Sequence, residues 1–224
     1  MPLIHHENIE NGEIGLWKIS ETADELYHLA HLSAQDEITF SGITAPHRQK
    51  EWLATRALLN ALLDEPQQIS YHDDGRPYLE NNITNISITH STGYIAVLLH
   101  TSSIPGIDIE LLSRQVGRVA SRFLSPEELT FCRIIPEHSN YRMLFHWCAK
   151  EAIFKIVPLS NIEFATEIQV LINDLSAESG SFHGTFHHKT GAIPITLYYQ
   201  IVNEVLIVWG WVEKSLFNLK NNSN

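Results

Sequence analysis

Cysteine and basic residues are scarce in this sequence. Its 224 residues include two cysteines, and 15 lysines and arginines stand against 26 acidic residues. Cys132 and Cys148 both lie in apolar patterns with helical spacing, which predicts buried thiols in a reducing compartment. The formal net charge of −11 argues against a general nucleic-acid binder, because such a protein would carry a basic stripe.

Long apolar runs, targeting signals and zinc motifs are missing as well. The longest apolar runs, such as 205–212, are far shorter than a membrane span. The N-terminus lacks the charged-then-apolar form of a signal peptide. The 13 histidines form no H-E-x-x-H motif and the cysteines no C-x-x-C motif, which disfavours a zinc site. We therefore expect a cytoplasmic protein without a membrane partner.

What the sequence does contain is typical of a globular α+β protein. Hydrophobic residues make up 44% and charged residues 18%, and helical and alternating patterns follow one another along the chain. The helical patterns cover 22–32, a short segment capped by Ser33, 46–63, and two segments after Ser125. The strand patterns cover 13–19, 85–93, 94–100, 106–110, 163–172, 181–188, 195–202 and 205–212, and an Asn-rich tail at 214–224 is expected to fray.

A polar stretch with proline and glycine at 101–106 divides the chain. It gives an N-terminal half, 1–103, and a C-terminal half, 104–224, with similar contents of helix and strand. We expect two pseudo-symmetric α/β halves of similar topology, with the active site in the cleft between them. Such a chain forms its cleft by itself, so we expect a monomer.

The helical segment 147–155 carries a polar stripe beside an apolar face. Trp147, Glu151 and Lys155 follow one another at intervals of four, so they stack along one side of a helix. The neighbouring apolar positions would seat this helix against a core, with Glu151 and Lys155 at the rim. The same spacing is also that of an ordinary exposed ion pair.

The strand at 106–110 carries two carboxylates on one side. Alternation puts Asp108 and Glu110 about 7 Å apart on a shared face. The pair could simply face solvent, but beside a core it requires a cation. With Glu151 it would supply three hard oxygen ligands, which suits Mg²⁺ and a phosphate-bearing substrate.

In combination, these motifs resemble the 4'-phosphopantetheinyl transferases, in particular the long two-half type that activates the carrier domains of surfactin-like synthetases. The overall length agrees, and the matching motifs span 48–155. The specific part of the match is the pair G-I-D-I-E and W-x-x-K-E-x-x-x-K at this separation. The matching stretches are Arg48 to Arg56, Gly75-Arg76-Pro77, Ile86 to Ser91, Gly106 to Glu110 and Trp147 to Lys155.

The resemblance implies a reaction and the residues that perform it. The phosphopantetheine arm of coenzyme A would pass to a serine of an acyl or peptidyl carrier protein, releasing adenosine 3',5'-bisphosphate. Asp108, Glu110 and Glu151 would bind Mg²⁺. Glu151 would also take the proton from the serine hydroxyl, and Lys155 would stabilise the leaving phosphate.

The resemblance also assigns contacts to coenzyme A. Arg76 and His90 match positions that contact its phosphates, and cationic and N–H donors are what such a polyanion requires. Thr89 keeps the hydroxyl of the serine that the family commonly has before this histidine. Arg48 and Arg56 are candidates for the 3'-phosphate or the adenine region.

Two further departures from the family pattern affect these assignments. Leu111 stands where lysine is common, which removes a cation close to the carboxylates. Thr55 replaces a frequent glycine before Arg56, so the assignment of that arginine is the least supported.

Three arginines follow the acidic strand at intervals of four: Arg114, Arg118 and Arg122. Carrier domains of this class are generally acidic, so we hypothesise that these arginines form the carrier-docking edge. The alternative is a solvated helix face. Two other functions would use the same site residues, namely a Mg²⁺-dependent nucleotide phosphohydrolase and a non-catalytic coenzyme A binding module.

Overall fold

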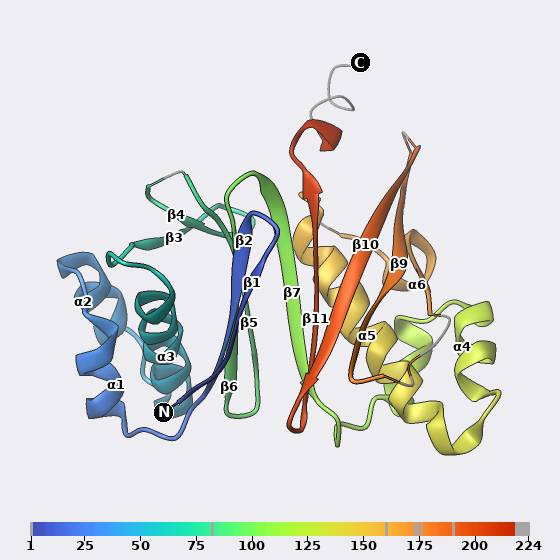
Figure 1. The fold of residues 1–224 in the computed structure, drawn as a ribbon, viewed down its shortest axis with the longest axis horizontal. Helices are drawn as coiled ribbons and strands as arrows, with labels where there is room; N and C mark the ends of the chain where they lie inside the picture. The colour runs from blue at the N-terminus through green and yellow to red at the C-terminus, as the bar shows by residue number, and fades with distance from the viewer. Residues whose placement is uncertain are drawn as a thin grey trace. The chain divides into compact units, whose positions relative to one another are not determined.

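The structure is a computed structural model that describes residues 2–217 except 82, 160, 173, 174, 176 and 190. It confirms the α+β class, because the described part of the chain combines helices with three antiparallel sheets (Figure 1). The chain divides into two compact units, Met1–Ser102 (unit 1) and Ser103–Asn224 (unit 2). None of the described helices combines the length and the apolar character needed to cross a membrane.

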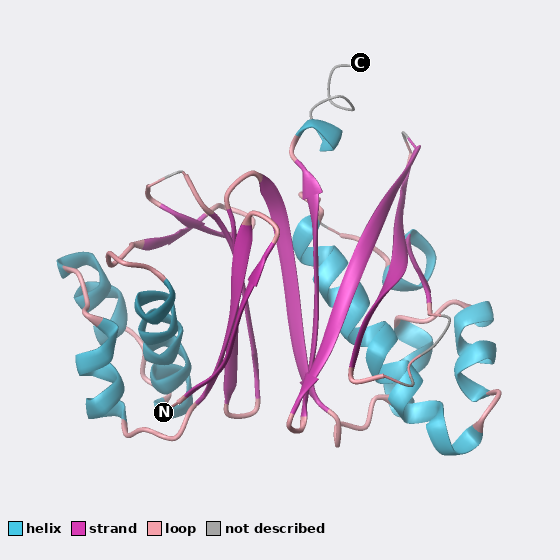
Figure 2. Cartoon of the chain, in the orientation of Figure 1, coloured by secondary structure: helices cyan, strands magenta, loops and turns pink. Residues whose placement is uncertain are grey.

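Unit 1 is built on an antiparallel sheet with the strand order β1-β2-β6-β5 and a separate β3–β4 pair. Figure 2 shows the helices of this unit on one side of the larger sheet. Its elements are β1 (Leu3–Ile9), β2 (Gly12–Lys18), α1 (Ala23–Ala30), α2 (Ala34–Ser41), α3 (Pro46–Leu62), β3 (Ile69–Tyr71), β4 (Pro77–Leu79), β5 (Asn85–Ser91) and β6 (Tyr94–His100).

The core of unit 1 forms where α3 packs on the sheet. Leu53, Ala57 and Leu58 recur at intervals that place them on one helix face, and all three are buried. They pack with Leu26 of α1 and with β6, which is buried along its whole length. The helix expected at 46–63 is confirmed, and Pro46 begins it, where a missing N–H leaves no intrahelical hydrogen bond unmade.

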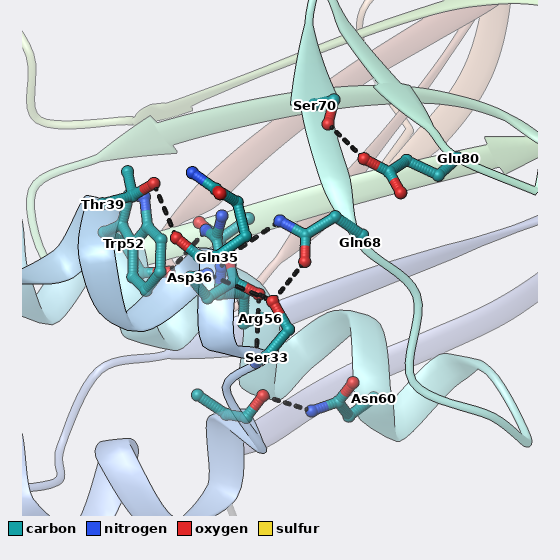
Figure 3. Close-up of polar contacts among 12 residues, drawn as sticks. Ser33, Gln35, Asp36, Thr39, Trp52, Arg56, Asn60, Gln68, Ser70 and Glu80 are labelled. Atoms are coloured by element: carbon teal, nitrogen blue, oxygen red, sulfur yellow. Dashed lines mark hydrogen bonds and ion pairs between the residues drawn. The ribbon is translucent and has the colours of Figure 1, made fainter.

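A buried polar network ties α2 to α3 (Figure 3). Arg56 Nε donates to Asp36 Oδ1 at 2.7 Å, and the two side chains are only 6% and 8% exposed. The Arg56 guanidinium also lies 3.2 Å from the centroid of the Trp52 ring. Asp36 closes the capping box of α2 with Ser33 and accepts a hydrogen bond from Gln68. Arg56 of α3 thus neutralises Asp36, which lies in the first turn of α2. Asp36 in turn contacts Gln68 in the segment before β3.

Unit 2 is built on a five-stranded antiparallel sheet with the order β7-β11-β10-β9-β8. Helix α5 packs on this sheet, chiefly on β7 and β11. The elements are β7 (Ser103–Leu111), the 3₁₀ helix η1 (Gly117–Arg122), α4 (Pro126–Arg133), the 3₁₀ helix η2 (Pro136–His138), α5 (Ser139–Ile156), α6 (Phe164–Glu167), β8 (Ile168–Leu171), β9 (Ser179–His188), β10 (Gly191–Val202) and β11 (Val205–Glu213).

Several elements differ from the sequence-based expectation. β1 was not predicted, because its half-exposed, polar sequence LIHHENI lacks clear alternation. β3 and β4 have three residues each, too few for a periodic pattern. The strand expected at 163–172 divides into α6 and β8. Of the tail expected to fray, 215–217 form a helical turn and 218–224 lie outside the described residues.

Candidate active site

Strand β7 carries Asp108 and Glu110 on the face that meets α5. Both carboxylates are buried, and Ile107 and Ile109 are buried on the opposite face, as strand alternation requires. Two adjacent buried acids are costly unless donors or cations surround them. The contacts around them are therefore the centre of the site.

Positive and N–H donors from α5 and from the loop after β7 contact these carboxylates. Lys155 Nζ donates to Asp108 Oδ1 at 2.7 Å and to the carbonyl oxygen of Ile107 at 2.8 Å. Trp147 Nε1 donates to Glu110 Oε1 at 2.8 Å. Arg114 pairs with the same Glu110 oxygen. The predicted stripe along α5 thus contacts β7 through both its ends, Trp147 and Lys155.

Glu151, between those two residues on α5, shares the same electrostatic environment. Burial raises the pKa of its carboxyl to about 7, and the negative charges of Asp108 and Glu110 add to the increase. Lys155 and Arg114 act in the opposite direction. The three predicted carboxylates (Asp108, Glu110 and Glu151, called the acidic trio below) are therefore close enough for their charges to interact.

The acidic trio is not arranged as a ready cation site. Within the described ranges, no three His, Cys, Asp or Glu side chains converge in a geometry that could hold a metal ion. Carboxylate oxygens of Asp108 and Glu110 are engaged by Lys155, Arg114 and Trp147. The chemistry of the donor set still fits Mg²⁺, because mutually repelling hard oxygen ligands are what this ion binds. The assignment of Mg²⁺ to these residues stays a prediction.

Gly106 allows α5 to approach β7 closely enough to build this site. A Cβ at Gly106 would lie 2.1 Å from the backbone oxygen of Ala152, an atom that cannot move without shifting the helix. Glycine is therefore required by the close approach of two backbones. Ala152 directly follows Glu151, so the glycine of the G-I-D-I-E motif sets how near Glu151 comes to the strand.

Lys150 is a key residue of α5 that the sequence reasoning missed. It is completely buried, and its Nζ donates to Glu128 Oε2 at 2.6 Å and to the carbonyl oxygens of Phe164 and Ile168 at 2.8 and 2.6 Å. Glu128 also closes the capping box of α4 with Ser125 and accepts from the Val170 N–H. The sequence does indicate the position of Glu128, because a serine followed three residues later by a glutamate is typical of a capping box at the start of a helix.

In unit 1, the structure brings together two of the residues assigned to coenzyme A. Arg48, in the first turn of α3, lies with its Nη1 3.2 Å from His90 Nε2 on β5. Glu51 pairs with Arg48 at 3.0 Å and lies 3.8 Å from the same His90 nitrogen. Thr89 precedes His90 on β5 and is buried. Arg48 and His90 are exposed and form one polar cluster.

The two other arginines assigned to coenzyme A are placed differently. Arg76 follows the β3–β4 turn and pairs with Asp74 at 2.6 Å. Figure 1 shows β3 and β4 at the end of the unit away from the β5–β6 turn. Arg56 lies in the buried network with Asp36. Its contact with coenzyme A stays untested, and its burial favours a structural role.

Arg56 and Arg48 should therefore respond differently to the same substitution. Arg56→Met should lower the free energy of unfolding by about 3 kcal/mol, because it leaves Asp36 buried without its counter-charge. Arg48→Met removes only an exposed pair and should change it by at most about 0.5 kcal/mol. Chemical denaturation of both variants checks this, and equal losses would contradict the structural role of Arg56.

The arginines after β7 do not form the helical stripe that their spacing suggested. Arg114 lies outside any helix and pairs with Glu110. Arg118 and Arg122 are exposed on η1, a 3₁₀ helix with about three residues per turn, so an interval of four does not align them. The interval of four therefore does not indicate a shared helix face, and the hypothesis that these arginines form the carrier-docking edge stays a prediction.

The segment that contains the acidic trio matches a known protein-family model. Residues 105–200 match the model of the 4'-phosphopantetheinyl transferase superfamily. A Haemophilus influenzae protein named "Putative 4'-phosphopantetheinyl transferase" is 31% identical over 119 residues, which are 48% of this chain and 49% of that protein. The alignment thus spans about half the length of this curated relative. Asp108, Glu110, Glu151 and Lys155 all lie within 105–200, whereas Arg48 and His90 lie outside it.

Proposed function

We propose that this protein transfers the 4'-phosphopantetheine arm of coenzyme A to a serine of an acyl or peptidyl carrier protein and releases adenosine 3',5'-bisphosphate. The observation that carries the proposal is the acidic trio with Lys155 in its midst, within the region similar to the superfamily. The partners are coenzyme A and the carrier protein. Pseudo-symmetry of the two halves, a cleft between them and a monomeric state stay predictions.

We assign a separate chemical role to each site residue of unit 2. Asp108, Glu110 and Glu151 would hold Mg²⁺, which when bound neutralises negative charge that develops on the pyrophosphate. In the ion-free protein, burial and the neighbouring carboxylates raise the pKa of Glu151 to about 7. A bound cation would keep this carboxyl ionised, and as a carboxylate it would accept the proton from the attacking serine hydroxyl. Lys155 Nζ would supply positive charge to the leaving phosphate. The nucleophile comes from the carrier, so this chain needs none of its own.

The residues of unit 1 would bind the nucleotide part of coenzyme A. Arg48 and His90 form an exposed cluster with donors suited to a phosphate. Thr89 is buried, so its contact with coenzyme A stays a prediction from the resemblance. The Arg76 side chain is half-buried and pairs with Asp74, a carboxylate whose place a phosphate could take. We leave Arg56 out of this set, because its guanidinium is already engaged by Asp36.

Mass spectrometry of an apo acyl carrier protein tests the proposal. Incubation with this protein, coenzyme A and Mg²⁺ should add the mass of one phosphopantetheine arm to the carrier, and a carrier whose acceptor serine is alanine should gain nothing. Absence of the gain with every acyl and peptidyl carrier tried would overturn the proposal. Breakdown of coenzyme A without a carrier would instead indicate the phosphohydrolase, and binding without turnover the non-catalytic module.

The carrier-docking hypothesis now concerns the exposed arginines of η1. Replacing both Arg118 and Arg122 with Glu should raise KM for an acidic carrier by roughly ten-fold and leave KM for coenzyme A unchanged. Arg133→Glu on α4, also exposed, is the charge-matched control for the single variants Arg118→Glu and Arg122→Glu, which should each show part of this effect. Steady-state kinetics with each substrate varied in turn measures both constants, and unchanged carrier kinetics would rule this edge out.

A further inference from the structure

Arg114 covers the most deeply buried carboxylate of the acidic trio. Its side chain is 46% exposed, whereas that of Glu110 is 4% exposed, so the guanidinium lies on the solvent side of the pair. The charges of Glu110, Asp108 and Glu151 all act on Arg114. The Arg114 guanidinium thus interacts electrostatically with all three carboxylates of the trio.

We infer that Arg114 is a built-in counter-ion of the acidic trio, which a divalent cation must displace from Glu110 in order to bind. The inference rests on the proposed function and deepens it, because it names the residue that sets the affinity for the ion. A guanidinium and a divalent cation repel each other, so both cannot lie against the same Glu110 oxygen. Displacement of Arg114 is therefore part of ion binding.

The contacts distinguish Arg114 from the second cation at the trio, Lys155. The Lys155 side chain is 24% exposed and is fixed by two acceptors, Asp108 and the carbonyl oxygen of Ile107. It also belongs to α5, whose packing against β7 holds it in place. Arg114 is more exposed and follows a turn, so its side chain can rotate into solvent. We therefore expect Lys155 to keep its contact with Asp108 and Arg114 to leave Glu110 when the ion binds.

The backbone of Arg114 is held beside the site, and its guanidinium lies near a tryptophan ring. Its N–H donates to the Leu111 carbonyl oxygen, and its own carbonyl oxygen accepts from Asn140 Nδ2 at 2.9 Å. The guanidinium lies 5.4 Å from the centroid of the Trp147 ring, within the range of a cation–π contact. Movement of Arg114 should therefore change the environment of the Trp147 indole, which gives ion binding an optical signal.

Calorimetric titration of the full chain with Mg²⁺ or Mn²⁺, without coenzyme A or carrier, tests the inference. Arg114→Gln should bind either ion about ten-fold more tightly than the wild type, because no counter-ion has to leave. Arg118→Gln removes the same charge from an exposed position on η1 and should stay within about two-fold. Arg114→Lys, which keeps the charge but loses the planar fork, should lie between the wild type and Arg114→Gln.

Tryptophan fluorescence gives a second readout. The wild type should show an ion-dependent change that is lost in Arg114→Gln and in Trp147→Phe. Equal or weaker ion binding by Arg114→Gln would overturn the inference while leaving the transferase proposal standing, provided that the wild type modifies a carrier. Absence of ion binding in every variant would overturn the inference and the assignment of Mg²⁺ to the trio together.

Discussion

Replacing Glu151 with Gln should lower the turnover number for carrier modification on the order of a thousandfold. The amide keeps the shape of the side chain but can neither accept the serine proton nor contribute a charge to the acidic trio. Intact-mass measurement of carrier modification over time determines the rate. Glu127→Gln, an exposed position on α4, is the matched control and should keep the wild-type rate.

The same substitution should stabilise the protein when no divalent ion is present. The pKa of Glu151 rises from 4.5 to about 7 on folding, so the folded state binds its proton more tightly than the unfolded chain does. The resulting stability is complete below pH 4.5 and is lost as the pH rises through 7. At pH 8 the free energy of unfolding of the wild type should therefore lie about 3 kcal/mol below that of Glu151→Gln, because each pKa unit corresponds to about 1.4 kcal/mol.

Opposite signs for activity and stability distinguish a functional carboxylate from a structural one. Denaturation in a chelating buffer should give Glu151→Gln the higher free energy of unfolding at pH 8 and equal values near pH 4.5. A loss of both activity and stability would instead show that Glu151 supports the fold. Wild-type turnover in Glu151→Gln would remove this residue from the mechanism altogether.

The elements that carry the site could be predicted because their patterns are local. Alternation along Gly106–Glu110 and the interval of four from Trp147 to Lys155 follow from the geometry of one strand and one helix. The apolar face predicted for α5 is buried in the structure. For β7 the sequence left open whether the carboxylates face solvent, and the structure buries both faces of the strand. Whether these acids bind a metal ion is a separate question that the fold alone does not answer.

The partners of several charged residues could not be predicted, because they come from distant parts of the chain. Arg56 and Asp36 are 20 residues apart, and no periodicity links them. Lys150 and Glu128 are 22 residues apart and meet only when α4 packs on α5. The 3₁₀ conformation of η1 was likewise not predicted, because an interval of four residues is the spacing of an α-helix.

The Lys150–Glu128 pair should give the largest loss of stability in unit 2. Lys150→Met should lower the free energy of unfolding by about 3 to 5 kcal/mol, because Glu128 keeps its charge in a buried position without a partner. The carbonyl oxygens of Phe164 and Ile168 also lose their common donor. Chemical denaturation measures the loss, and hydrogen exchange should show the weakest protection in α4.

A double-mutant cycle separates the charge pair from the packing of the lysine stem. Glu128→Gln removes the charge, so Lys150→Met should be less damaging in that background, with a coupling energy of at least about 1 kcal/mol. Recovery should be partial, since an amide has a single oxygen and Glu128 also accepts from Ser125 and Val170. Arg133→Met on the exposed side of α4 should stay within about 0.5 kcal/mol of the wild type. A loss below about 1 kcal/mol for Lys150→Met would mean that the buried pair does not hold α4 against α5.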